Sequence, residues 1–277
     1  MAQETHSSAR RGMYILPSLF TAGSIALGYY VIMESIRGTV VSDPALRAMA
    51  FDRAAMAIIF AIVFDGLDGR IARMTNTSSE FGKELDSLAD VITFGVAPSL
   101  LAYLWGVRQL APSGHPEIEG RVMHFGMVVC FLFLICGASR LARFNISINP
   151  QPRNPGLPGR KYFVGMPIPA AAGVLAAVIH FEAGSPVYSV WISLVWLGLV
   201  AFTGFLMVSS WRFWSGKEID MSARKPGRLL ALVVVIIGVV VEWHQTALLV
   251  MALGYLVSGV MARLAYSLKR RIGRRAG

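Results

Sequence analysis

Four aspartates lie within a segment of 26 residues, and their spacing is that of residues on helix faces. Asp65 and Asp68 are three residues apart. Asp86 and Asp90 are four apart, so each pair shares one face if its segment is helical. Four carboxylates brought together from two helices would repel one another strongly in a partly desolvated place. Hard divalent cations relieve that repulsion, and ligation by oxygen alone favours Mg²⁺, Mn²⁺ or Ca²⁺ over zinc. Two cations shared between pairs of carboxylates are the natural count.

Small residues accompany these carboxylates. Gly66, Gly69 and Ala72 recur at every third position, and Gly82 precedes the second pair of aspartates. Such residues leave a bare stripe on a helix, which admits either a ligand or a closely packed neighbouring helix. Both interpretations fit the glycines, but packing does not explain the aspartates. Arg73 adds a positive charge suited to phosphate, and it equally fits a basic residue flanking a membrane helix.

The composition is that of a membrane protein. The chain has 277 residues, of which 55% are hydrophobic, and its mean hydropathy is +0.57. Soluble domains average about 45–50% apolar residues even when glycine is counted. We expect one integral membrane domain over residues 1–277, with a polar segment at 1–12 and a basic tail at 267–277. The net charge of +10 fits basic loops that contact anionic membrane lipids, so nucleic acid is not an expected partner.

Eight apolar stretches predict an all-α, polytopic bundle of about eight transmembrane helices. Arginine and lysine concentrate in alternate connections and in the tail, which places both termini in the cytoplasm by the positive-inside rule. The aspartates then lie at the cytoplasmic face of the membrane, most simply the inner membrane of a bacterium. The stretches are 13–34, 48–73, 82–106, 122–143, 163–181, 187–209, 228–243 and 246–266.

Two further features concern single segments. Cys130 and Cys136 are six residues apart in one apolar run, which puts them on different faces of a helix and argues against an internal disulfide.

The proline-rich stretch 149–159 predicts a loop on the aspartate side of the membrane. It either covers the site or serves as a rigid connector.

The acidic segment resembles the signature of the CDP-alcohol phosphotransferase family, Asp-x2-Asp-Gly-x2-Ala-Arg-x8-Gly-x3-Asp-x3-Asp. All eight fixed positions match without a gap. They are Asp65, Asp68, Gly69, Ala72, Arg73, Gly82, Asp86 and Asp90. The resemblance implies a helical, homodimeric membrane enzyme that transfers a phosphatidyl group from a CDP-linked lipid to an alcohol and releases CMP.

The resemblance also implies roles for single residues. The four aspartates become the ligands of the divalent cations, Mg²⁺ or Mn²⁺, and Asp90 becomes the general base on the acceptor hydroxyl. The CDP part of the site is implied at Gly66, Gly69, Ala72, Arg73 and Gly82, with Pro17 and Thr21 as further candidates on the first helix. Ser18 stands where the family often has asparagine, so a nucleotide contact at that place is not carried over.

Neighbouring residues indicate the acceptor. Ser87 and Val91 stand where the glycerol-phosphate branch of the family usually has proline and lysine, and segments 139–145 and 165–173 also resemble the serine branch. The resemblance therefore implies CDP-diacylglycerol as donor and L-serine as acceptor. Arg140 and Arg143, three apart near a helix end, are suited to grip the serine carboxylate, with Asn145 as a further hydrogen-bond donor. The alternative is that both arginines are loop-flanking charges or bind lipid phosphate.

Other functions remain as alternatives. Choline, inositol, inositol phosphate or glycerol phosphate would serve as acceptor in the same family, and Arg153, Arg160 and Lys161 are available for a phosphorylated one. A divalent-cation transporter is a different class, against which no inverted repeat or pair of broken helices is evident. A structural scaffold does not account for four clustered carboxylates.

Overall fold

A computed structural model describes residues 2–75, 80–112, 115–146, 162–214 and 242–273, and helices form most of it. The first half contains α1 (Ala2–Val40), α2 (Pro44–Thr75), α3 (Glu80–Asp90), the π-helix η1 (Val91–Val96) and α4 (Ala97–Gly106). The second half contains α5 (Pro116–Ile146), α6 (Ile168–Phe181), α7 (Val190–Val208) and α9 (His244–Gly273), with two short strands, β1 (Tyr162–Val164) and β2 (Arg212–Trp214).

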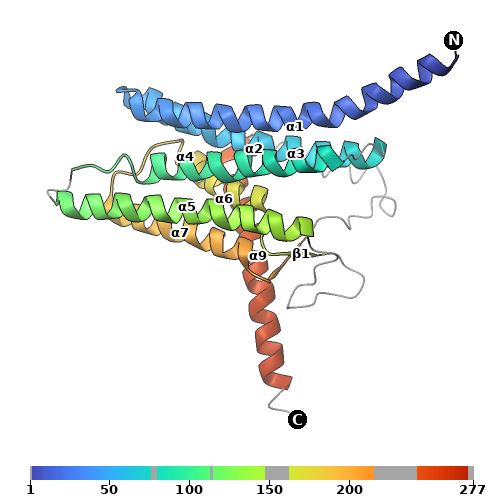
Figure 1. Ribbon diagram of the computed structural model, residues 1–277. Helices are drawn as coiled ribbons and strands as arrows, with labels where there is room; N and C mark the ends of the chain where they lie inside the picture. Colours follow the sequence, from blue (N-terminus) through green and yellow to red (C-terminus); the bar gives the residue numbers. More distant parts are fainter. Residues whose placement is uncertain (1, 76–79, 113–114, 147–161, 215–241, 274–277) are drawn as a thin grey trace.

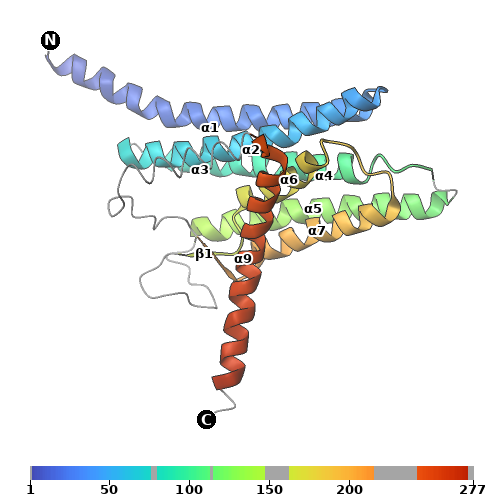
Figure 2. The same cartoon turned by 180° about the vertical axis from the view of Figure 1, so that it is seen from behind.

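The helices are arranged in layers. Helices α1 and α2 pack along each other on one side of the bundle, and α3, η1 and α4 follow one another as a single rod against α1 (Figure 1). Helices α5 and α7 form a pair on the opposite side, and α6 lies between these layers. Helix α9 crosses the others steeply, and its C-terminal half extends away from them (Figure 2). The prediction of an all-helical bundle is therefore confirmed in its main feature.

Five described helical segments are long and apolar enough to cross a membrane. They are Leu19–Val40, Glu80–Gly106, Pro116–Ile146, Val190–Val208 and His244–Leu268. Helix α6 is apolar but only 14 residues long. Helix α2 is not among the five, and its first ten residues carry Arg47, Asp52 and Arg53. An integral membrane protein follows from these segments, whereas the expected count of eight is not established, because residues 228–241 of the stretch 228–243 lie outside the described residues.

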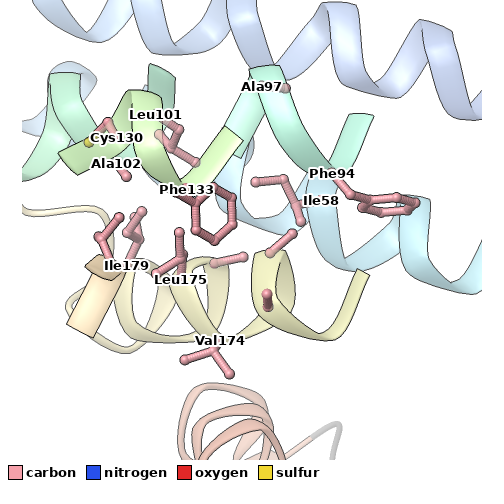
Figure 3. Packing of buried hydrophobic residues seen from close by; sticks show 14 of the residues in the cluster. Ile58, Phe94, Ala97, Leu101, Ala102, Cys130, Phe133, Val174, Leu175 and Ile179 are labelled. Carbon is pink, nitrogen blue, oxygen red and sulfur yellow. The ribbon is translucent and has the colours of Figure 1, made fainter. Parts of the chain in front are cut away.

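The hydrophobic core holds the layers together. Ile58 on α2, Leu101 on α4, Phe133 on α5 and Leu175 on α6 are all buried and converge in one cluster (Figure 3). Alanines on the same faces, such as Ala171, keep the helix backbones close. This cluster packs α2, α4, α5 and α6 together, and α2 continues from it into the acidic segment.

The stretch 163–181, predicted as one helix, has a different structure at its start. Strand β1 pairs antiparallel with β2, with Phe163 opposite Phe213, and the helix begins only at Ile168. Gly165 has φ +76°, a left-handed conformation that favours glycine, and a side chain there would meet the carbonyl oxygens of Met207 and Ser209. Apolar periodicity alone did not reveal this turn. The expected absence of a disulfide holds, because Cys130 and Cys136 are both free thiols.

Candidate active site

Three of the predicted carboxylates come together at one end of the bundle. Asp65 on α2 and Asp86 and Asp90 on α3 each offer an oxygen, and these oxygens lie within 4.8 Å of one another. All three residues are half-buried. Oxygens on opposite sides of one Mg²⁺ lie about 4.2 Å apart, and those around Ca²⁺ about 5 Å apart. The cluster therefore has the spacing and the ligand chemistry that one hard divalent cation requires.

The remaining family positions on α2 are described only by their backbone. Asp68 follows Asp65 by one helical turn within α2, so its backbone lies on the same face. The side chains of Asp68, Ala72, Arg73 and Pro17, and the surroundings of Gly69, lie outside the part of the chain whose side chains are described. Their roles stay predictions.

Gly66 borders open space. A methyl group built on its Cα would meet no atom within 4 Å. Packing between described residues therefore does not require glycine here, which distinguishes Gly66 from Gly28 on α1, where such a group would lie 2.9 Å from the Thr93 Cα. The described residues therefore leave α2 uncovered at Gly66, the residue after Asp65.

A π-helix follows the cluster directly. Segment η1 begins at Val91, the residue after Asp90, and π-helical turns occur frequently at functional sites. The hydroxyl of Thr93 donates a hydrogen bond of 2.9 Å to the carbonyl of Ser24 on α1, and both residues are buried. The contact fixes the end of α3 against α1, the helix on which buried Thr21 also lies. No pattern in the sequence predicted this segment.

The two predicted acceptor arginines on α5 have different surroundings. Arg140 is buried, with 7% of its surface exposed, and its Nε has no hydrogen-bond partner in the part of the chain that is described. Its charge interacts with that of Asp90. The guanidinium therefore lies within electrostatic reach of one carboxylate of the acidic cluster, with a donor that its described surroundings leave unsatisfied.

Arg143 donates hydrogen bonds to main-chain carbonyls. Its Nη1 donates to Val208 at 3.0 Å, and its Nη2 lies 3.4 Å from the carbonyl oxygen of Met207 and 3.5 Å from those of Val164 and Ser209. A cation at the C-terminal end of α7 also interacts favourably with the helix dipole. Arg143 thereby ties α5 to the end of α7 and to β1.

Asn145 connects α5 to α3. Its Nδ2 donates a hydrogen bond of 2.9 Å to the hydroxyl of Ser87, which directly follows Asp86 on α3. Ser87 in turn donates to the carbonyl of Lys83 at 3.0 Å. This contact brings the end of α5 to the helix that carries two of the carboxylates. The proline-rich stretch 149–159, predicted as a loop on this side, lies outside the described residues.

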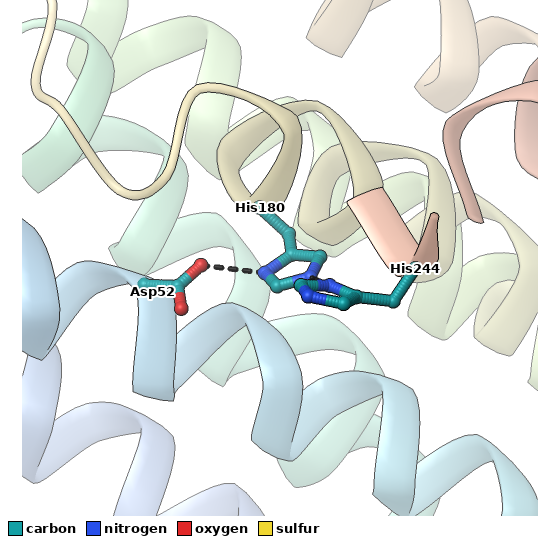
Figure 4. Close-up of polar contacts among 3 residues, drawn as sticks. All are labelled: Asp52, His180 and His244. Atoms are coloured by element: carbon teal, nitrogen blue, oxygen red, sulfur yellow. Dashed lines mark hydrogen bonds and ion pairs between the residues drawn. The ribbon is translucent and has the colours of Figure 1, made fainter. Parts of the chain in front are cut away.

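A second polar cluster, not predicted from the sequence, lies elsewhere on α2. His180 near the end of α6 contacts Asp52 through Nδ1 at 2.6 Å and His244 through Nε2 at 2.7 Å (Figure 4). His180 is buried, and the carboxylate of Asp52 requires that Nδ1 of His180 carry the proton. The three residues are far apart in sequence, so no local pattern could have revealed them.

Comparison with known proteins agrees with this geometry. A family model of CDP-alcohol phosphatidyltransferases matches residues 14–199. The chain is 36% identical over 263 residues to the CDP-diacylglycerol–serine O-phosphatidyltransferase of Helicobacter pylori, covering 93% of this chain and 94% of that protein. It is 31% identical over 179 residues to the Saccharomyces cerevisiae protein of the same name, covering 65% and 58%, respectively. It is also 35% identical over 156 residues to that of Methanocaldococcus jannaschii, covering 56% and 61%.

The matched region contains both helices of the acidic cluster and the helix that carries Arg140. The signature residues, their convergence in space and the extent of the similarity all agree, and the chain belongs to the CDP-alcohol phosphatidyltransferase family.

Proposed function

We propose that this chain is a CDP-diacylglycerol–serine O-phosphatidyltransferase, which transfers a phosphatidyl group to L-serine and releases CMP. The observation that carries the proposal is the buried guanidinium of Arg140, whose Nε has no partner among the described residues, within electrostatic reach of Asp90 in the cluster of three carboxylates. Carboxylates suit the cations that accompany a diphosphate, and a buried guanidinium suits the carboxylate of an amino acid. Relatives with this activity in their names align over most of the chain.

The metal would be held by the aspartates. Asp65, Asp86 and Asp90, together with Asp68 one turn along α2, supply enough oxygens for two ions, Mg²⁺ or Mn²⁺. When bound, the ions neutralise the diphosphate of the donor and stabilise the charge on the departing CMP.

Asp90 would act as the general base. Its half-buried carboxylate lies at the end of α3, and its charge interacts with that of Arg140, which we assign to the serine carboxylate. Asp90 takes the proton from the serine hydroxyl. The serine oxygen then forms a bond to the lipid-side phosphorus, and the bond from that phosphorus to the bridging oxygen breaks. CMP departs with the bridging oxygen and its electron pair.

The donor and the acceptor would occupy different sides of the cluster. The open space at Gly66 adjoins the donor side, and Gly69, Ala72, Arg73, Gly82, Pro17 and Thr21 remain proposed contacts of the CDP group. On the acceptor side, Arg140 is the guanidinium with an unsatisfied donor, whereas Arg143 is engaged by main-chain carbonyls. We therefore assign Arg140 to the serine carboxylate, Arg143 to the support of β1, and Asn145 to the contact between α5 and α3.

The site would face the cytoplasm of a bacterial cell. Lys83 lies on the helix of the cluster, and Arg140 and Arg143 lie near the same end of the bundle. Basic residues collect on the cytoplasmic side of membrane proteins, which also places both termini there in an eight-span topology. A lipid donor would then enter from the bilayer, and serine from the cytoplasm.

The test is CMP release by the purified full-length protein in detergent, with CDP-diacylglycerol, Mn²⁺ or Mg²⁺, and a panel of acceptors. Release that depends on L-serine and yields phosphatidylserine supports the proposal. Release only with glycerol phosphate, inositol, inositol phosphate or choline keeps the family chemistry and overturns the acceptor. Metal flux in proteoliposomes without CMP release with any acceptor would favour a cation transporter.

A further inference from the structure

Helix α1 packs against both helices that carry the acidic cluster. The ring centre of Phe20 lies 6.1 Å from that of Phe64, and the ring of Phe64 also lies against Gly23. Phe64 directly precedes Asp65 on α2. Helix α1 therefore contacts α2 at the residue next to the first carboxylate of the cluster.

The same stretch of α1 contacts η1 three residues after Asp90. There the Thr93 hydroxyl donates its hydrogen bond of 2.9 Å to the carbonyl of Ser24. One turn further along α1, a methyl group built on Gly28 would lie 2.8 Å from the Thr93 hydroxyl oxygen and 2.9 Å from its Cα. Glycine at position 28 therefore lets α1 approach η1 closely enough for the hydrogen bond to form.

These two contacts lie at the same level of α1. Gly23 and Ser24 are consecutive residues, so they differ by about 1.5 Å along the helix axis. Helix α1 thus fixes α2 beside Asp65, and η1 just after Asp90, relative to each other. Oxygens of these two aspartates lie within 4.8 Å of one another although they belong to different helices. A shift of either helix along α1 would separate them.

The Thr93 hydroxyl bonds between helices rather than within its own. The hydroxyls of Ser99, Thr203 and Ser209 each donate to the carbonyl three residues earlier in the chain. Such local bonds to the helix backbone are common for serine and threonine. The Thr93 hydroxyl instead bonds to a residue 69 positions away. Both partners are buried, so this bond is shielded from competition by water.

We propose that Thr93 is a positioning residue for the acidic cluster: through its bond to Ser24, it holds Asp90 at the distance from Asp65 at which both bind the metal ion. This inference rests on the proposed function, in which Asp90 is also the general base. Thr93 itself touches neither the ion nor the substrates in this assignment. Its influence on the reaction is exerted through the placement of Asp90.

The first test is Thr93→Val, which keeps the branched shape and removes the hydroxyl. At saturating Mn²⁺ we expect kcat for CMP release to fall about 10–100-fold, because a displacement of about 1 Å can cost 10²-fold. The KM values for both substrates should stay within about twofold, as expected when the loss is in the chemical step. Thr93→Ser keeps the donor and should restore most of kcat.

The matched control is Thr203→Val. Thr203 is as deeply buried as Thr93, and its hydroxyl donates a bond of the same length, 2.9 Å, but within α7. We expect its kcat to equal that of the wild type. Equal losses of kcat in Thr93→Val and Thr203→Val, or a Thr93→Ser variant as impaired as Thr93→Val, would overturn the proposal.

A measurement without turnover separates positioning from general destabilisation. Mn²⁺ alone should raise the thermal unfolding midpoint of the wild type and of Thr203→Val. In Thr93→Val, the Mn²⁺ concentration that gives half of this rise should increase about 10-fold or more, the range for loss of a contact that orients a metal ligand. A lower midpoint without metal, combined with a wild-type Mn²⁺ response and wild-type kcat per folded molecule, would show a merely structural role and overturn the proposal.

A second variant tests the contact from the side of α1, and it serves if Thr93→Val does not fold. Gly28→Ala should displace η1 and cause the same loss of kcat and of Mn²⁺ response. Gly198→Ala on α7, where a methyl group would meet no atom within 4 Å, should cause neither. Wild-type behaviour of Gly28→Ala would contradict the proposal.

The Mn²⁺ response also distinguishes this inference from the proposed function. If the wild type uses another acceptor, the proposed acceptor fails, and Thr93 is judged by kcat with the acceptor that is used. If the wild type releases no CMP with any acceptor, the proposed function fails. The shift of the unfolding midpoint by Mn²⁺ then decides the role of Thr93, and an unchanged response in Thr93→Val excludes it.

Discussion

Two of the three aspartates on helix α2, Asp52 and Asp65, have different surroundings. Asp52 has a histidine neighbour that donates to it, and the partner histidine is itself bound to a third residue, His244. About 20 Å further along the helix axis, Asp65 lies among the oxygens of Asp86 and Asp90, which are acceptors when ionised. The first cluster is complete without a ligand. The second brings three carboxylates together, a concentration of negative charge that suits a bound cation.

The geometry of the histidine cluster supports this distinction. The ring centroids of His180 and His244 are 4.9 Å apart, with nitrogens 2.7 Å apart. At that nitrogen distance, the separation of the rings is close to its maximum, so the two nitrogens point at each other. Such a head-on arrangement suits a linear hydrogen bond, whereas two ligands of one metal would point at a common third position. The comparison teaches that acidic residues on a membrane helix indicate a cation site where several carboxylates converge, and a structural contact where a single carboxylate pairs with a histidine.

Removing one charge from the acidic cluster should have the largest effect on activity. Asp90→Asn should lower kcat by about 10²–10⁴-fold, the range for loss of a general base, while the protein still binds the CDP-lipid. Asp52→Asn is the matched control on α2 and should keep kcat within a few-fold. CMP release under saturating substrates measures both. Comparable losses in the two variants would remove the functional distinction between the clusters.

Removing divalent metal should distinguish the acidic cluster from the histidine cluster by a second measurement. A chelator should reduce CMP release to background, and Mn²⁺ or Mg²⁺ should restore it. The same ions should raise the thermal unfolding midpoint of the wild type, because a ligand that binds only the folded state stabilises it. That rise should persist in His180→Ala and disappear in Asp86→Asn. A rise that survives in Asp86→Asn would place the ion elsewhere.

The two arginines on α5 show the same contrast between a functional and a structural role, with a smaller expected effect on activity. Arg140→Ala should raise the KM for serine about tenfold or more, as expected for a lost charged hydrogen bond, with a smaller change in the KM for the donor. Arg143→Ala should instead lower the thermal midpoint and alter both KM values alike, because its partners are main-chain carbonyls. Steady-state kinetics and thermal unfolding distinguish them. The opposite pattern would exchange their assignments.

The smallest effect is expected at the histidine cluster. His180→Ala removes contacts between α2, α6 and α9, and should reduce stability by about 1–3 kcal/mol with activity per folded molecule unchanged. His124→Ala is the matched control, because His124 is exposed and bonds within its own helix, to the Gly120 carbonyl. Thermal unfolding in one detergent measures both. A loss of activity without a loss of stability would mean that this cluster takes part in the reaction.

Local sequence patterns were sufficient to predict much of the structure of this molecule. Helical spacing placed the aspartates of each pair on one face, and the predicted convergence of the two pairs is confirmed for Asp65, Asp86 and Asp90. It stays a prediction for Asp68, whose side chain lies outside the described part of the chain. The family followed from eight signature positions and is confirmed. Apolar length predicted most helices but not the start of α6, where Gly165 and a strand pairing override periodicity.

The remaining features depend on contacts between distant segments. The partnership of Asp52 with His180 joins residues 128 positions apart, and that of Tyr255 with Trp214 joins residues 41 apart. The π-helix after Asp90 is likewise held by a contact between α1 and η1. The sequence by itself determined the chemistry of the site, since carboxylate type and helical period are local properties. Only the tertiary structure decided which polar groups satisfy one another and which remain for a ligand, because that depends on how the helices pack.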